Sequence, residues 1–137
     1  MLTQAAFAGV WQLQRQIDDR YGRQQGGFDG RAVFHDAGVG HLRYVEEGTI
    51  KFGAGPAFTA HRHYQWHFGD GIVEVRFADG GAFHHFVPEG VVAGTDHPCG
   101  QDHYKVQYDF RRWPDWQAVW TVTGPRKDYT STSHYTL

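Results

Sequence analysis

Hydrophobic and polar residues alternate along most of the chain with a period of two. Residues 58–68 show the pattern most clearly, because Tyr64 and Trp66 share one parity while His63 and His67 share the other. Successive side chains on a β-strand point to opposite faces, so the pattern predicts half-buried strands. Similar runs cover residues 10–17, 28–34, 41–51, 73–77, 83–87, 91–97, 104–110, 116–123 and 127–135. About nine or ten strands are therefore predicted, a spacing typical of all-β sandwiches and barrels.

Tight turns connect these strands in sequence order. Asp70-Gly71 and Asp79-Gly80 are dipeptides that favour two-residue hairpins. Consecutive hairpins favour an up-and-down meander, and closing the meander into a barrel removes the exposed sheet edges. The expected fold is all-β, a single antiparallel up-and-down β-barrel that covers residues 1–137 as one domain.

Three segments depart from the alternating pattern. Residues 2–8 predict a short helical turn capped by Thr3, which is too short to be more than a plug or lid. Residues 20–27 are rich in Gly, Gln and Arg and predict a mobile loop. Residues 98–100 predict another turn.

Composition and charge narrow the class of protein. The chain has 137 residues, enough for a hydrophobic core, and its 18 glycines and 16% aromatic residues are typical of β-rich proteins. A net charge of −2 disfavours nucleic acid and anionic membranes as partners. No opening signal segment and no apolar run of about 18 residues are found. Cys99 is the only cysteine, which excludes an intrachain disulfide and favours the cytoplasm.

The two ends of the chain resemble the calycin pattern. Gly9-Val10-Trp11 opens the first predicted strand, and Arg126 precedes the last. In calycins a Gly-x-Trp opens the barrel, and a basic residue from the last strand packs across the indole at the closed end. A guanidinium over an indole contributes about 0.5–2 kcal/mol when it is partly desolvated. The resemblance implies that Arg126 covers Trp11.

Four further segments resemble one bacterial family of calycin-like barrel proteins, which is known as a domain of unknown function. These segments are residues 62–68, 79–84, 97–104 and 120–129. The resemblance covers nearly the whole chain and implies a lipocalin-like barrel. It implies no activity, because function depends on the site and not on the fold.

Charged residues share the parity of aromatic residues that must face the lumen. Arg62 lies in line with Tyr64, Arg15 with Trp11, and Glu46 follows the same alternation. Buried charges are costly unless they are paired. The arrangement predicts either an internal salt-bridge network or a lumen that binds an anion or carboxylate.

The turn around Cys99 gathers chemically active side chains. His97, Cys99, Asp102 and Tyr104 lie within eight positions. A Cys beside a His, with a carboxylate to orient the ring, suggests nucleophilic catalysis. Isolated cysteines are more often small buried hydrophobic residues. A structural or ligand-contacting role is therefore the favoured interpretation.

Ten histidines raise the question of a metal. His61, His63 and His67 share one face of a strand and suit a divalent ion, whereas His84 and His85 point to opposite faces. The parity that turns the neighbouring aromatic residues inward turns the first three outward, so an exposed polar face is favoured. A haem would need only one axial histidine, but no motif indicates it, and the fingerprints of nucleotide binding are absent. No metal and no cofactor are expected.

The preferred hypothesis is a cytoplasmic barrel that binds a small molecule, an aromatic or carboxylate-bearing compound, in a polar and aromatic lumen. A cofactor-free lyase or isomerase, in which Glu46 or His85 moves a proton, is the alternative. A structural or partner-binding module is the third hypothesis, and a homodimer is left open. The candidate ligand-binding residues are Arg15, Glu46, Arg62, Tyr64, His85, His97, Cys99, Asp102, Tyr104, Tyr108 and Trp120.

Overall fold

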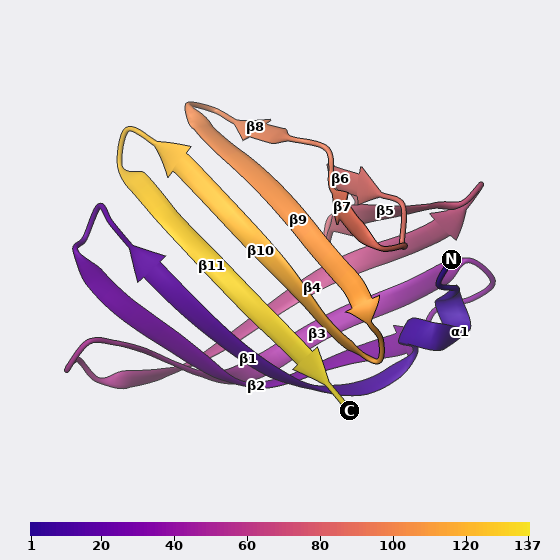
Figure 1. Cartoon of the computed structure of the whole chain (residues 1–137), viewed down its shortest axis with the longest axis horizontal. Coiled ribbons are helices and arrows are strands. Elements are labelled where there is room, and N and C mark those ends of the chain that lie inside the picture. Colours follow the sequence, from indigo (N-terminus) through magenta and orange to yellow (C-terminus); the bar gives the residue numbers. More distant parts are fainter.

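The computed structural model describes residues 1–137, and its strands form one antiparallel 11-stranded sheet that curves around a lumen (Figure 1). Its elements are α1 (Gln4–Phe7), β1 (Gly9–Asp19), β2 (Gln24–Asp36), β3 (His41–Phe52), β4 (Ala57–Gly69), β5 (Ile72–Phe77), β6 (Ala82–Phe86), β7 (Val91–Ala93), β8 (His97–Cys99), β9 (Asp102–Arg112), β10 (Asp115–Gly124) and β11 (Lys127–Thr136). Since α1 has only four residues, the protein contains no helix that is long and apolar enough to cross a bilayer.

Pairing of the first and last long strands joins the two ends of the meander. The order along the sheet is β6-β5-β4-β3-β2-β1-β11-β10-β9-β7, and β8 also pairs with β9. The remaining edge strands are β6 and β7, and the segment that follows β7 contacts β6 through two hydrogen bonds: Thr95 N donates to the carbonyl of His85, and His85 N donates to Thr95 Oγ1, both over 3.0 Å. The predicted up-and-down barrel is confirmed, and it is nearly closed.

Two local predictions are wrong. The expected strand over residues 91–97 is divided into β7 and β8, and Pro98 lies inside β8 rather than in a turn. The loop predicted over residues 20–27 is confined to a turn at residues 20–23, because β2 begins at Gln24 and pairs with β1 from there. Ladder hydrogen bonds from β1 and β3 on its two sides outweigh the low strand propensity of this Gly- and Gln-rich stretch.

A pair of glycines lets β2 and β3 approach closely. Gly30 and Gly48 are register partners, and a Cβ on Gly30 would lie 2.6 Å from the Cα of Gly48. A Cβ on Gly48 would lie 2.8 Å from the ring of Phe28. The missing side chains therefore leave room for Phe28, whose ring lies 5.1 Å from the guanidinium carbon of Arg15 inside the barrel.

An aromatic cluster closes the end of the barrel at which α1 lies. Phe7 is fully buried, and its ring centroid lies 5.0 Å from that of Trp113 and 5.6 Å from that of Trp116. Trp11 is buried as expected, and its Nε1 donates to the carbonyl of Phe7 over 2.9 Å. The expected helical turn thus acts as a plug, although its Thr3 side chain forms no capping hydrogen bond.

The predicted packing of Arg126 over Trp11 is wrong. Arg126 is exposed in the turn between β10 and β11. Asp19, at the far end of β1, pairs with Tyr129 near this turn, so Trp11 and Arg126 lie at opposite ends of the barrel. The indole hydrogen bond to Phe7 and the neighbouring tryptophans replace the expected cation-π contact.

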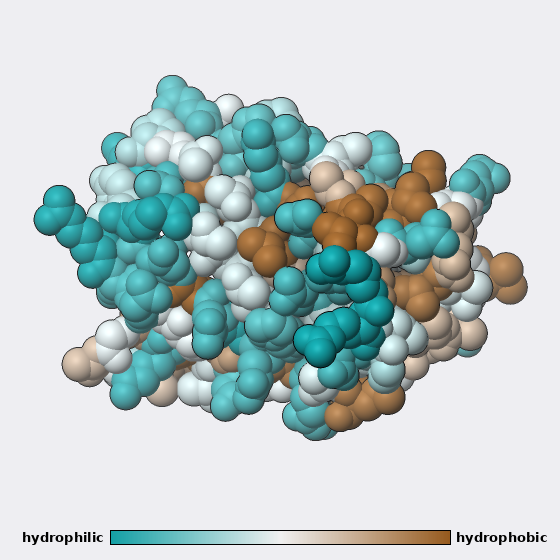
Figure 2. Space-filling model, viewed as in Figure 1, coloured by the Kyte–Doolittle hydropathy of each residue, from teal (hydrophilic) through white to brown (hydrophobic).

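Hydrophilic residues cover most of the surface in the view of Figure 2. Hydrophobic residues that reach this surface gather towards the side of α1 and β5 to β7. Val39, in the turn between β2 and β3, is 99% exposed. The strands therefore direct their apolar parity inward, as the alternation predicts.

Phe7→Ala should destabilise the protein by about 3–5 kcal/mol, because it leaves a cavity in the aromatic plug. The free energy of unfolding in urea, followed by tryptophan fluorescence, measures the loss. Val39→Ala provides the control and should change stability by less than about 0.5 kcal/mol. A loss below about 1 kcal/mol for Phe7→Ala would show that α1 is not part of the core.

Candidate functional site

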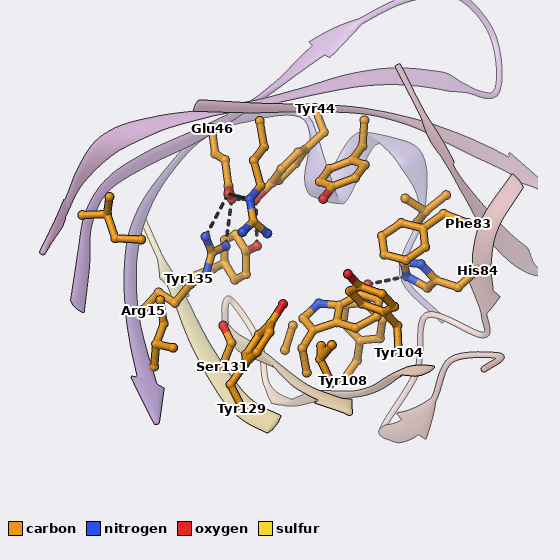
Figure 3. A pocket seen from close by; sticks show the side chains of 18 of the residues that line it. Arg15, Tyr44, Glu46, Phe83, His84, Tyr104, Tyr108, Tyr129, Ser131 and Tyr135 are labelled. Atoms are coloured by element: carbon orange, nitrogen blue, oxygen red, sulfur yellow. Dashed lines mark hydrogen bonds and ion pairs between the residues drawn. The ribbon is translucent and has the colours of Figure 1, made fainter. Parts of the chain in front are cut away.

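A cavity of about 340 Å³ lies inside the barrel, beyond the aromatic plug (Figure 3). It is lined by 21 residues, 15 of them hydrophobic. Its volume falls within the range of about 300–1,000 Å³ found for ligand pockets. Six of the seven tyrosines of the chain line it. The lining residues that carry a polar group other than Trp are Arg15, Asp19, Tyr44, Glu46, Arg62, Tyr64, His84, Tyr104, Tyr108, Tyr129, Ser131 and Tyr135.

Strict alternation along the long strands brings these side chains together. The inward orientation predicted for Tyr64, Tyr104 and Trp120 is correct, since all three line the cavity. Figure 3 shows Tyr44 on one wall and Tyr104 and Tyr129 on the wall opposite. β3 and β4 build the first wall, and β9 to β11 build the second. Two aromatic walls therefore face each other across the empty space.

Arg15 and Glu46 form a buried ion pair across β2. The Nη1 and Nη2 atoms of Arg15 donate to Oε1 and Oε2 of Glu46, each over 2.9 Å. The side chains are only 9% and 2% exposed. Arg15 Nε also donates to Ser133 Oγ over 2.7 Å, and the Tyr44 hydroxyl donates to Glu46 Oε2 over 2.5 Å. The predicted internal salt-bridge network is present.

The ion pair holds both partners in their charged forms. Burial alone would raise the pKa of Glu46, but hydrogen bonds from Arg15 and Tyr44 and the charge of Arg15 lower it below its usual value. Burial likewise opposes the charge on Arg15, and the contacts with Glu46 reverse this effect and raise its pKa. Burial raises the pKa of Tyr135 to about 12 and that of Tyr44 well above its usual value. Neutral hydroxyl groups therefore surround a fixed pair of charges.

Arg62 lies at the rim of the cavity rather than deep inside it. Its side chain is 55% exposed, although it lines the cavity as its parity predicts. The Nε atom lies 3.7 Å from Glu46 Oε1, beyond hydrogen-bonding distance. The expectation that Arg62 is buried with the aromatic residues of β4 is wrong, because β5 pairs with β4 only from Tyr64 to Gly69 and leaves Arg62 on an unpaired stretch of the strand.

A β-bulge places His84, not His85, at the cavity. The register between β5 and β6 shifts between Val75 and Arg76, so that Phe83 and His84 both line the lumen in succession. His85 is exposed on the outside, and its predicted inward orientation is wrong. A bulge changes the parity of one strand by one residue, and alternation in the sequence does not reveal it.

His84 is a buried neutral imidazole. Its Nε2 is 2.8 Å from the Tyr108 hydroxyl, while Nδ1 is buried without a partner. Burial lowers the pKa of His84 to about 3, and the neighbouring His85 and His97 contribute to the shift. Tyr108 is itself fully buried, and burial raises its pKa well above its usual value. The pair is therefore uncharged near neutral pH.

The turn around Cys99 does not assemble at the cavity. Cys99 is exposed, and of the four residues singled out there only Tyr104 lines the lumen. The ring of His97 packs 5.2 Å from that of Phe83. Asp102 forms an ion pair with Lys127, and the distance between Asp102 Oδ2 and Lys127 Nζ is 3.0 Å. His97 and Asp102 therefore have structural partners, and the thiol of Cys99 lies outside the cavity.

The contact between Lys127 and Tyr104 was not predicted from the sequence. Half of the polar residues that line the cavity were also missed. Lys127 Nζ donates to the Tyr104 hydroxyl over 2.9 Å. Its hydrogen bonds to Tyr104 and Asp102 both raise the pKa of Lys127. Alternation on β3 and β11 carried the signal for most of the missed residues. The polar lining residues missed from the sequence are Asp19, Tyr44, His84, Tyr129, Ser131 and Tyr135.

The outer face of β4 carries the histidines considered as metal ligands. His61 and His63 are exposed, with ring centroids 5.8 Å apart. His67 Nε2 is 3.1 Å from Gln65 Oε1, and its ring lies 4.4 Å from that of His41. No group of three or more His, Cys, Asp or Glu side chains is arranged to hold a metal ion.

Glu46→Gln should destabilise the protein by about 3–5 kcal/mol, because it leaves Arg15 buried without a counter-charge. Urea unfolding at neutral pH measures the loss. The double variant Arg15→Leu/Glu46→Leu should recover part of it, since it removes both charges. Equal losses in the single and double variants would contradict this electrostatic explanation.

His84 should make stability depend on pH between about 7 and 5. Its folded pKa of about 3 lies below the ordinary value of 6.5, so the unfolded chain binds a proton that the folded chain does not. Stability therefore falls as the pH drops through this range, by about 2 kcal/mol at most. His84→Gln should flatten the slope of unfolding free energy against pH, while the exposed neighbour variant His85→Gln should keep it. An unchanged slope in His84→Gln would assign the pH dependence to another group.

Comparisons with known proteins agree with this architecture. No curated protein sequence matches the chain. The S-type phycobiliprotein lyase CPES from Guillardia theta has a similar structure, with a TM-score of 0.67 and 9% identity over 96% of this chain and 86% of the lyase. EF1p2_mFAP2b bound to DFHBI gives a TM-score of 0.45 and 12% identity, over 96% and 92% of the two chains. The likeness to the lyase supports the expected antiparallel barrel fold. The model of the family of unknown function DUF6314 matches residues 7–137, and the chain belongs to this family.

Proposed function

We propose that the protein binds a small aromatic compound inside the barrel. The observation that carries this proposal is the cavity of about 340 Å³, which is lined by six tyrosines together with Trp66 and Trp120. Ligand pockets are usually concave and largely apolar, with a few polar groups in fixed positions. Aromatic side chains offer planar surfaces for stacking, and tyrosine adds a hydroxyl for hydrogen bonding. A planar ring between the two walls would contact both.

The polar network inside the lumen favours a binding role over a purely structural one. A barrel that serves only as a scaffold is most stable with a lumen filled by hydrocarbon side chains. This lumen keeps an empty volume beside the buried charges of Arg15 and Glu46. Retaining both features is costly for folding, and a bound ligand would occupy the empty volume.

The same residues do not favour proton transfer as the main role. An efficient general acid or base has a pKa near the working pH. Glu46 is held ionised by Arg15, and the pKa of His84 is about 3. His85, the other proposed proton carrier, is outside the lumen. Binding is therefore the preferred function over a lyase or isomerase.

The sequence also suggests the domain organisation, the location and the class of partner of the protein. We propose a single domain over residues 1–137 in the cytoplasm, with a small molecule rather than nucleic acid or a membrane as partner. A homodimer is compatible with this proposal, and size-exclusion chromatography with light scattering decides it.

The binding proposal is tested with N-phenyl-1-naphthylamine, a neutral aromatic probe that fluoresces in apolar surroundings. Wild-type protein should bind it with saturation. Ser131→Phe, which fills the cavity from β11, should weaken binding by about tenfold or more, equal to about 1.4 kcal/mol. Thr132→Phe, the neighbouring outward position, is the control and should bind as the wild type does.

Circular dichroism and urea unfolding check that both variants fold. Absence of saturable binding to the wild type would contradict the proposed function. Equal binding by folded Ser131→Phe would place the probe outside the lumen.

A further inference from the structure

Two arginines, Arg15 and Arg62, and two carboxylates, Glu46 and Asp19, line the cavity, and only Arg15 and Glu46 are joined by hydrogen bonds. Glu46 neutralises Arg15 through two hydrogen bonds, and its Oε1 also lies 3.7 Å from Arg62 Nε. Two guanidinium groups thus share one carboxylate. Asp19 is the only other charged residue in the lining, and its carboxylate accepts hydrogen bonds from the neutral donors Gly22 N over 3.0 Å and Gln24 Nε2 over 3.5 Å in the β1–β2 turn. Arg62 has only the 3.7 Å contact with Glu46, a carboxylate that Arg15 already neutralises.

Arg62 acts on the groups that face the mouth. It is the register partner of Glu46 on the neighbouring strand and precedes Tyr64 on the lumen parity. Burial raises the pKa of Tyr64 and of Tyr129, and the charge of Arg62 opposes the increase at both hydroxyls. The guanidinium is therefore electrostatically close to tyrosines on both walls of the cavity.

The hydroxyls on the far wall still have hydrogen-bond donors to offer. The Tyr129 hydroxyl forms no hydrogen bond within the protein, and the Tyr104 hydroxyl accepts one from Lys127, which leaves its own proton free. Figure 3 shows both hydroxyls on the inner side of the wall formed by β9 to β11. Lys127 is itself neutralised by Asp102. The cavity therefore presents free hydroxyl donors and the half-exposed guanidinium of Arg62.

An acidic group complements this arrangement, because a carboxylate or sulfonate accepts hydrogen bonds and donates none. We propose that the ligand is a flat aromatic acid, which deepens the function proposed above and rests on it. Its anionic group meets Arg62 at the mouth, and its ring lies further in, between Tyr44 and the wall of β9 to β11. Arg15 is not the anion-binding group, because Glu46 already neutralises it.

Two probes that differ by one charge test this inference. 8-Anilinonaphthalene-1-sulfonate carries a sulfonate on the anilinonaphthalene framework that neutral N-phenyl-1-naphthylamine shares. Arg62→Gln should weaken binding of the sulfonate by about fivefold, the effect expected from losing a partly exposed ion pair. Binding of the neutral probe should not change. Arg62→Lys should restore most of the affinity for the sulfonate.

Arg31→Gln is the matched control, because Arg31 is exposed on β2 and lies outside the cavity lining. It should leave the affinity for both probes unchanged. Added salt should weaken sulfonate binding in the wild type more than in Arg62→Gln, because screening acts on the ion pair.

The outcomes separate the two proposals. If the neutral probe binds the wild type in the lumen while Arg62→Gln leaves sulfonate binding unchanged, the aromatic-acid inference is overturned and the binding function stands. An equal loss for both probes in Arg62→Gln would also overturn it, because charge would not be the cause. Failure of both probes to bind the wild type would count against the function itself.

Discussion

The buried ion pair between Arg15 and Glu46 is the constraint on which the lumen depends. These residues lie on β1 and β3, which are separated by β2, so the pair spans the inner surface of three strands. A bidentate pair withdrawn from water needs further hydrogen bonds to offset its desolvation. Ser133 and Tyr44 supply them, and Tyr135 extends the network through a 2.8 Å contact with the Tyr44 hydroxyl. A lumen packed with hydrocarbon would leave no place for this network.

The two ends of the barrel differ in packing and polarity. At one end Phe7 and its tryptophan neighbours form a dense aromatic plug. At the other end the strands stop around a polar rim, where Arg62 is half exposed and Lys127 holds Tyr104 in place. The empty volume lies between the plug and the rim.

Strand alternation made most of the architecture predictable. The inward parity of Tyr64, Tyr104 and Trp120 and the near-closed barrel follow from local patterns of period two. The same parity placed Arg15 and Glu46 inside and left open whether they pair, which the structure shows they do. Prediction failed where a feature depends on long-range geometry. The bulge opposite Val75 exchanges His85 for His84 at the cavity, and no local residue pattern marks it. The prediction that Arg126 packs over Trp11 was wrong for the same reason, because a shared motif does not specify at which end of the barrel a turn lies.

The amino-acid sequence by itself determined the fold class and the parity of nearly every long strand, because side-chain direction alternates with each residue. It also determined that charges would enter the lumen, since they share the parity of large aromatic residues. Only the tertiary structure decided the depth of each side chain along the barrel axis. Arg15 is enclosed between neighbouring strands, whereas Arg62 lies on the stretch of β4 that β5 does not pair with, and where paired strands end depends on distant parts of the chain. Register between such strands arises from pairing across the whole sheet, which local sequence does not encode.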